Sequence, residues 1–210
     1  MTRNVIGIAG IESVRDKKDN VKYYSVTFLN NLYTWQKDHP NDILHIIDAR
    51  KFLKSKTPTT DIWNEARSAF GTGGIDCLVY SGHATDEHLW LYTHVLKTHP
   101  HEERCIGWEF DFTAPFNPDA EIWLLGCQCG GQNGKKWLNS IAQVMADKLD
   151  RRVWAFVSKC AQKKIKGGYY QVPDVGGYVE FVKQQSPVTL EYVLDDKSVI
   201  FQGISKETDL

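Results

Sequence analysis

The sequence predicts an α/β domain with a mostly parallel sheet, helices on both faces of that sheet and a C-terminal β-hairpin. Short, continuously apolar runs alternate with longer segments whose apolar residues recur at helical spacing. Continuous apolar runs are typical of strands that are covered on both faces, as they are in a parallel sheet. Near the end of the chain, two strand-like segments instead flank the short polar stretch 195–197, which indicates a hairpin.

The first half of the chain alternates strands and helices. Residues 4–11 form a short apolar run with two glycines, which indicates a buried strand. Residues 23–38 carry apolar side chains in a mostly helical pattern, and residues 42–50 are typical of a second buried strand, whose apolar part ends at Asp48. Residues 59–70 begin with Thr and Asp, which are favoured at helix starts, and then place apolar side chains on one face.

The second half continues the alternation. Residues 73–82 and 121–126 predict a third and a fourth strand, and residues 151–158 predict a fifth. Between the last two, residues 135–150 have an apolar stripe at helical spacing and predict a helix. In open α/β sheets, reacting groups gather just past the carboxyl ends of the strands, so the residues that follow each strand are the place to look for chemistry.

We expect one domain over residues 1–210, because this length suits a single sizeable domain and no segment has the composition of a linker. The Gly- and Lys-rich residues 161–187 predict a loop or a pair of loops. Residues 188–204 predict the hairpin.

The composition excludes several classes of protein. A net charge of −1 argues against electrostatic capture of nucleic acid or of an anionic membrane. No run approaches the roughly 20 apolar residues that span a bilayer, and the N-terminus lacks a signal-peptide pattern. Five cysteines without regular spacing argue against a disulfide framework, so we expect reduced thiols and a cytoplasmic location.

Two of the predicted strands end in chemically potent side chains. His83 follows one strand and a Ser-Gly turn, and Cys127 follows another strand and Gly126. If the strands are adjacent and parallel, the imidazole and the thiol lie close enough to act as base and nucleophile. Glycines around Cys127 allow a sharp turn with exposed N–H groups, and the helix dipole of residues 135–150 would favour the thiolate if it points at the sulfur.

These two motifs, "SGH" after one strand and "LLGC" after the next, resemble those of the caspase-like cysteine peptidases (clan CD). The likeness covers roughly residues 43–158 and is nearest to the self-cleaving domains of large bacterial toxins and related bacterial domains. It implies a caspase-like three-layer sandwich and an endopeptidase that cleaves protein or peptide substrates. In that reading Cys127 attacks the scissile carbonyl to form an acyl-enzyme, and His83 acts as base or orienting partner.

The resemblance also implies roles for residues around the dyad. The family usually has Gly after the His, whereas this chain has Ala84, which keeps an amide donor but shifts the geometry of the oxyanion site. Asp48 is the candidate for the acid that supports the His in the toxin domains, and Asp86 is the alternative. The remaining candidates are turn residues for the oxyanion and strand-end residues for the substrate pocket: Gly82, Ala84, Gly126 and Gln128 for the first, and Val157, Ser158 and Lys159 for the second.

We expect no required cofactor and no metal site. A short basic run is typical of a solvated face, and the alternatives are a binding site for an anionic activator, as the toxin domains have for an inositol polyphosphate, or a cleavable loop; the run comprises Lys159, Lys163, Lys164 and Lys166. Four further histidines form a cluster that could bind a metal, but they lack a repeated helical pair and are expected on the solvated surface: His88, His94, His99 and His101.

Two other functions stay open. The chain could be a catalytically inactive caspase-like module that binds a partner, or a thiol-redox or metal-binding protein that uses Cys127 and Cys129. Cys129 is either a core thiol or the second half of a Cys-x-Cys pair. Cys77, Cys105 and Cys160 are expected to be structural, because free cysteines are among the most buried residues.

Overall fold

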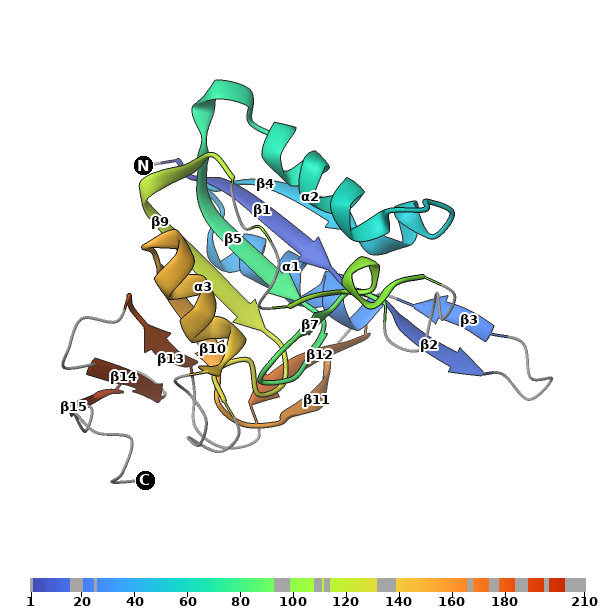
Figure 1. Ribbon diagram of the computed structural model, residues 1–210. Coiled ribbons are helices and arrows are strands. Elements are labelled where there is room, and N and C mark those ends of the chain that lie inside the picture. Colours follow the sequence, from blue (N-terminus) through green and yellow to red (C-terminus); the bar gives the residue numbers. More distant parts are fainter. Residues whose placement is uncertain are drawn as a thin grey trace.

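The computed structural model is built around one eight-stranded sheet with the strand order β15-β14-β13-β10-β9-β5-β1-β4 (Figure 1). The structure describes residues 2–15, 21–24, 26–92, 99–107, 111, 114–131, 139–165, 168–173, 178–183, 189–194 and 197–202.

Five neighbouring strands of this sheet run parallel, and three antiparallel strands follow them at one edge. The parallel strands are β1 (Asn4–Ala9), β4 (Ile43–Asp48), β5 (Ile75–Ser81), β9 (Phe116–Leu125) and β10 (Arg152–Phe156). The antiparallel strands are β13 (Tyr178–Phe181), β14 (Thr189–Leu194) and β15 (Lys197–Gln202). The predicted mixed α/β class and mostly parallel sheet are confirmed, and β14 and β15 form the predicted C-terminal hairpin.

Helices cover both faces of the sheet, as predicted. In Figure 1, α2 (Pro58–Ser68) and α3 (Ile141–Leu149) lie in front of the sheet and α1 (Val26–Asp38) lies behind it. Alternate residues of β1 serve the two faces: Ile6 and Ile8 pack in the core with α2 and α3, whereas Val5 and Ala9 pack with α1. No helix among the described residues is long and apolar enough to cross a membrane.

Short elements complete the structure. Two hairpins are formed by β2 (Glu12–Arg15) with β3 (Val21–Tyr24), and by β11 (Cys160–Ile165) with β12 (Gly168–Pro173). A small three-stranded sheet consists of β6 (His83–Ala84), β7 (Leu89–Trp90) and β8 (Cys105–Ile106). The 3-10 helices are η1 (Ala49–Phe52), η2 (Gly71–Gly73) and η3 (His101–Glu103).

The loop prediction for 161–187 was wrong, because β11 continues into this segment, and β12 and β13 lie within it. The glycines and lysines hid two runs rich in Tyr and Val, residue types that favour strands. The predicted helix 135–150 is described from Ser140, whose side chain accepts a hydrogen bond from the Gln143 amide and so caps α3. Its expected first part, residues 135–138, lies outside the described residues.

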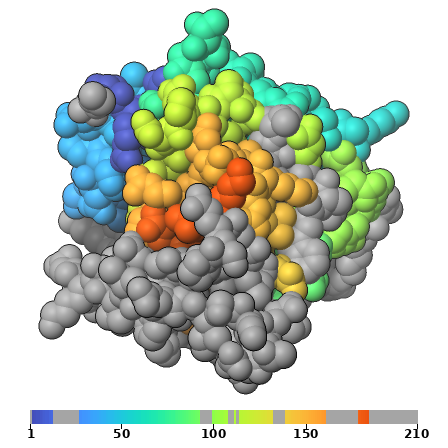
Figure 2. Space-filling view, turned by 60° about the vertical axis from the view of Figure 1, so that its left-hand side comes forward, coloured from blue at the N-terminus to red at the C-terminus, as the bar shows by residue number. Residues whose placement is uncertain are grey.

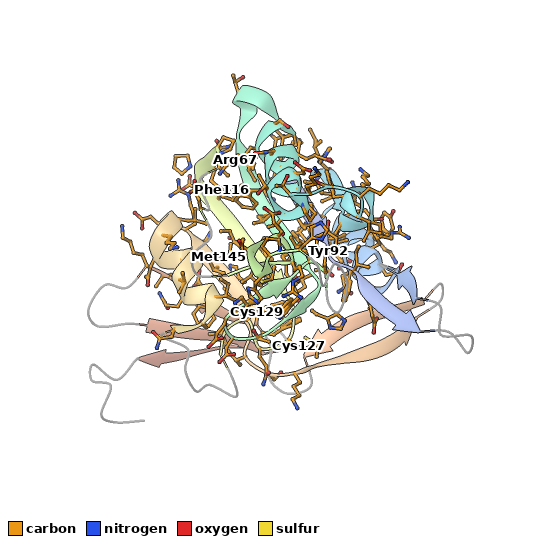
Figure 3. The ribbon with its side chains drawn as sticks, turned by 45° about the vertical axis from the view of Figure 1, so that its right-hand side comes forward. Arg67, Tyr92, Phe116, Cys127, Cys129 and Met145 are labelled. Atoms are coloured by element: carbon orange, nitrogen blue, oxygen red, sulfur yellow. The ribbon has the colours of Figure 1, made fainter. Side chains whose placement is uncertain are left out.

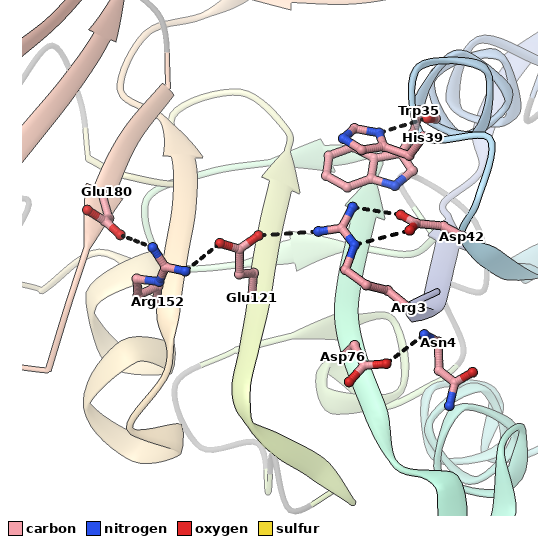
Figure 4. Close-up of polar contacts among 9 residues, drawn as sticks. All are labelled: Arg3, Asn4, Trp35, His39, Asp42, Asp76, Glu121, Arg152 and Glu180. Carbon is pink, nitrogen blue, oxygen red and sulfur yellow. Dashed lines mark hydrogen bonds and ion pairs between the residues drawn. The ribbon is translucent and has the colours of Figure 1, made fainter. Parts of the chain in front are cut away.

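Charged side chains tie together one end of the sheet, away from the carboxyl ends of the strands (Figure 4). Arg3 Nη2 lies 2.6 Å from Asp42 Oδ2, and Arg3 Nη1 lies 3.5 Å from Glu121 Oε2. Arg152 continues the row, 2.7 Å from Glu121 Oε1 and 3.6 Å from Glu180 Oε1. Figure 2 shows this side of the molecule, where the dark-blue start of the chain adjoins the yellow-green and orange residues of the later strands. This chain of ion pairs connects strands that are far apart in the sequence.

The order of the parallel strands creates a switch point between β1 and β5. From β1 the chain crosses by α1 to β4 on one side, and then returns by α2 to β5 on the other side. A switch point of this kind is where open α/β sheets bind ligands.

Candidate active site

The candidate site lies at the carboxyl ends of β1, β5 and β9. The pairing of β1 with β5 extends one step further, because the Gly10 amide donates a hydrogen bond to the Ser81 carbonyl at 2.8 Å. Beyond this point Glu12 enters β2 and His83 enters β6. A side chain at Gly10 would meet the Trp90 carbonyl oxygen at 2.9 Å, so only glycine lets these segments approach so closely.

His83 is held by a buried tyrosine from the preceding strand. The Tyr80 hydroxyl lies 2.6 Å from the His83 carbonyl oxygen and 2.8 Å from the Trp90 carbonyl oxygen, so its one proton is shared between backbone acceptors on both sides of the β6–β7 hairpin. Any side chain at Gly82 would clash with this hydroxyl. Burial raises the pKa of Tyr80 well above its usual value, so the hydroxyl stays protonated and remains a donor.

The imidazole of His83 has an aromatic neighbour and an acidic one. Its ring meets Phe28 edge to face, with centroids 5.2 Å apart. Its Nε2 lies 4.0 Å from Glu12 Oε1, and about a third of each of these two side chains is exposed. The carboxylate that faces His83 is therefore Glu12, which the sequence analysis did not single out.

Cys127 stands on a tight turn that directly follows β9. Gln128 adopts a left-handed conformation with φ 58°, which is uncommon for a residue with a side chain. The turn is fastened to the neighbouring strand, because the Gln128 amide donates to the Ser158 carbonyl and the Gly130 amide donates to the Phe156 carbonyl, both at 2.9 Å. A strained, over-determined turn of this kind is a mark of functional sites.

The thiol of Cys127 is half-buried and receives a backbone hydrogen bond. The Cys160 amide donates to Cys127 Sγ at 3.2 Å. Because an N–H group interacts more strongly with a charged acceptor than with a neutral one, this contact favours the thiolate. Figure 3 shows Cys127 and Cys129 near the end of the sheet, with Cys127 on the side of β11 and β12.

The loops that carry His83 and Cys127 touch each other. A Cβ atom added at Gly126 would lie 2.7 Å from the Ala84 Cβ and 3.0 Å from the Gly82 carbonyl oxygen. Ala84 thus places its methyl group directly over Gly126. The absence of a side chain at Gly126 is what allows the two loops to meet.

The first two amides of α3 bind both loops. The Ile141 amide donates to the Asp86 carbonyl at 2.7 Å, and the Ala142 amide donates to the Cys129 carbonyl at 3.1 Å. Two backbone contacts at the helix start therefore tie α3 to the segments that follow His83 and Cys127. The amide that reaches Cys127 comes from the start of β11.

Cys129 is a core thiol. It is fully buried, and its Sγ donates to the Gly126 carbonyl at 3.2 Å. Burial raises the pKa of this thiol far above its usual value. Cys129 is consequently a poor nucleophile, and among the described residues it does not belong to a cluster of side chains that could hold a metal ion, which favours the first of the two roles that the sequence left open. No disulfide joins any of the five cysteines, all of which lie in the described part of the chain.

Asp48 faces Arg50. Its carboxylate accepts hydrogen bonds from the Arg50 side chain, the shortest at 2.5 Å, and from the Arg50 amide at 2.9 Å, so it caps η1. The contacts of Asp86 described above are made by its backbone carbonyl. The turn into η1 brings Arg50 to this carboxylate.

The candidate oxyanion and pocket residues divide into structural and exposed groups. The amide of Gln128 is already used by Ser158, whereas its side-chain Nε2 is buried and has no hydrogen-bond partner among the described residues. Val157 belongs to the hydrophobic core, and Ser158 is buried. Lys159 is exposed. The side chains of Lys163, Lys164 and Lys166 lie outside the described part of the chain.

The histidines expected on the surface differ in their environments. His99 is half-buried, with Nε2 2.9 Å from the Ser55 carbonyl oxygen, so a solvated position was wrong for it. His88 and His101 instead approach Cys105. His94 lies outside the described residues. The sequence signal for this cluster is the spacing of His101 and Cys105, which are four positions apart and separated by the turn of η3.

No family model, no curated protein and no solved structure matches this chain. The function is therefore argued from the geometry of the site.

Proposed function

We propose that the chain is a cysteine endopeptidase of the caspase-like type, with Cys127 as nucleophile and His83 as base. The observation that carries this proposal is the environment of Cys127. Its half-buried sulfur stands at a strand end, accepts the Cys160 amide at 3.2 Å, and lies on a loop in contact with the His83 loop. The strand order and the sites of the two motifs are compatible with a caspase-like sandwich.

The proposed reaction proceeds in two steps. His83 takes the thiol proton as Cys127 Sγ attacks the scissile carbonyl carbon, and the tetrahedral intermediate collapses as the C–N bond breaks. The imidazolium returns its proton to the leaving amine, which leaves a thioester on Cys127. A water molecule, deprotonated by His83, then attacks the thioester and releases the carboxylic acid product and the free thiol.

The surrounding residues hold these two groups in place. Tyr80 fixes the backbone of His83, and Glu12 offers a carboxylate that favours the imidazolium formed in the first step. Because both Glu12 and His83 are about one-third exposed, that support is modest. Lys159, exposed beside the amide that touches Cys127, favours acidic or neutral substrate side chains.

The test is selective alkylation followed by substrate cleavage. With limiting iodoacetamide at neutral pH, mass spectrometry should find Cys127 modified before the buried Cys77 and Cys129. His83→Ala should slow cleavage of a peptide library by roughly 10²–10⁴-fold, the usual contribution of a general base. Cys127→Ala should abolish cleavage, and Cys160→Ala, which keeps the backbone amide, is the matched control.

Two results would count against a peptidase. Full cleavage by the Cys127→Ala variant would show that Cys127 is not the nucleophile. A reactive Cys127 without cleavage of any library peptide would favour the inactive, partner-binding module, and Ala84, whose methyl group covers Gly126, is the departure that supports this second candidate.

A further inference from the structure

We propose that His88, His101 and Cys105 form a zinc-binding site, separate from Cys127. The three side chains each offer one ligand atom, and these atoms all lie within 4.8 Å of one another. Cys105 Sγ lies 3.5 Å from Nδ1 and 3.6 Å from Nε2 of His101. The proposal concerns metal binding and does not depend on peptidase activity.

The spacing of these atoms fits a tetrahedral ion. Zinc binds thiolate sulfur at about 2.3 Å and imidazole nitrogen at about 2.0–2.1 Å, which places sulfur and nitrogen about 3.6 Å apart at a tetrahedral angle. The distances between Cys105 and His101 already have this value. Because His101 is exposed and His88 is half-exposed, their rings can turn to direct one nitrogen each at the ion.

The backbone around the three ligands is well defined. His101 and Cys105 flank the turn of η3, in which the Arg104 amide donates to the His101 carbonyl at 2.9 Å. His88 precedes β7, and its carbonyl accepts the Thr85 amide at 2.9 Å. Strand pairing then sets Trp90 of β7 opposite Cys105 of β8. Two separate segments thus present ligands across one small sheet.

One side of the site is closed and the other is open. Cys105 is fully buried, so the thiolate would meet the ion from the protein interior. The Trp90 ring lies 5.3 Å from the His101 ring and 5.6 Å from the His88 ring, measured between centroids, and it walls one flank. Two imidazoles and one thiolate suit zinc, and three protein ligands leave a fourth position for water.

The same small sheet carries His83. In the β6–β7 pairing His83 lies opposite Trp90, and in the β7–β8 pairing Trp90 lies opposite Cys105. An ion held by His88 on one side and by His101 and Cys105 on the other would therefore link the β6–β7 hairpin to β8. It would act as a structural clamp on the segment that presents the imidazole of His83.

Cobalt(II) is the probe for this site, because its spectrum reports both thiolate ligation and tetrahedral geometry. Chelator-treated protein titrated with Co²⁺ should show a thiolate-to-cobalt charge-transfer band and intense visible bands that saturate at one equivalent. Both should be lost in His88→Ala and Cys105→Ala. They should persist in Cys127→Ser, and in His99→Ala, a matched control that removes a nearby histidine bonded to Ser55.

A thermal melt keeps the test decisive if Cys105→Ala folds poorly. Zinc at a hundred times its Kd should raise the Tm of the wild-type chain by about 5 °C or more, and should leave the Tm of the half-exposed His88→Ala variant unchanged. The proposal is overturned if no charge-transfer band forms, or if the band survives His88→Ala and disappears in Cys127→Ser. In the first case the three side chains form only an aromatic cover over a buried thiol.

Discussion

The contact between the His83 loop and the Cys127 loop makes Gly126 the most informative position to change. In Gly126→Ala the new methyl group would lie 2.7 Å from the Ala84 Cβ, against an ordinary carbon–carbon contact of about 3.5–4.0 Å. The loops must separate by about 1 Å to accept it. Overpacking of this kind costs about 1–3 kcal/mol, and since the backbone at Gly126 is not left-handed, Ala returns about 0.4–1 kcal/mol through the unfolded chain.

We therefore expect Gly126→Ala to lower the free energy of unfolding by about 1–2 kcal/mol, which is a fall in Tm of roughly 2–8 °C. Alkylation of Cys127 should slow in the same variant, because the His83 loop is displaced. Adding Ala84→Gly removes the methyl group that clashes. The 3.0 Å approaches to Cys129 Sγ and to the Gly82 carbonyl remain, so the rescue should be partial.

A double-mutant cycle of Gly126→Ala and Ala84→Gly measures this contact directly. Urea unfolding of the four proteins should give a favourable coupling of about 1 kcal/mol, and the alkylation rate should recover in the double variant. If the two single costs instead add to within about 0.5 kcal/mol, the loops do not touch, and the argument that brings His83 to Cys127 fails.

Four further predictions use other contacts. Tyr80→Phe should cost about 1–3 kcal/mol and slow alkylation of Cys127, because the carbonyls of His83 and Trp90 lose the hydroxyl donor that they share; unfolding that matches wild type would contradict this. Glu12→Gln should lower the cleavage rate a few-fold, since an ion pair that is about one-third exposed contributes at most about 1 kcal/mol. Asp48→Asn should leave the cleavage rate unchanged. A larger loss of rate in Asp48→Asn than in Glu12→Gln would identify Asp48 as the supporting acid. Arg3→Met should destabilise the protein by about 1–3 kcal/mol, because it leaves the buried Asp42 carboxylate without its partner, yet the alkylation rate should not change at this distance from the site. In denaturant titrations the free energy of unfolding should fall as the pH rises above about 9, because burial raises the folded-state pKa values of two thiols and two phenols above their unfolded values of 9.0 and 10.0. The contribution of each group to stability is fully present below its unfolded pKa and falls by about 1.4 kcal/mol per pH unit above it. A flat profile to pH 11 would refute this for Cys77, Cys129, Tyr80 and Tyr92.

The sequence was most informative where hydrophobic periodicity alone decides the structure. The apolar strands and their order placed His83 and Cys127 at the ends of β5 and β9, and these strands are neighbours in the sheet. Burial on both faces produces such runs, so they are legible without any tertiary information. His83 and Cys127 could be identified as candidates from their positions just after predicted strands.

The parts that the sequence could not predict depend on loops and on partners distant in the chain. Glu12 faces His83 because the neighbouring strands β1 and β5 bring the segments that follow them together, and Cys127 receives a hydrogen bond from an amide 33 positions away. The left-handed Gln128 has no signature in its residue type. Asp48 lies at the expected strand end, but the turn into η1 places its carboxylate against Arg50, and the sequence pattern did not reveal that contact.

The two hydrogen bonds at the start of α3 have a mechanical consequence. Ile141 holds the segment after His83 and Ala142 holds the segment after Cys127, so one rigid element carries both halves of the site. Bending of the sheet between β5 and β9 would be transmitted to the two loops together, and their separation would change less than their absolute positions. The helix α3 therefore limits changes in the distance between the two loops, and so helps to keep His83 and Cys127 aligned with each other.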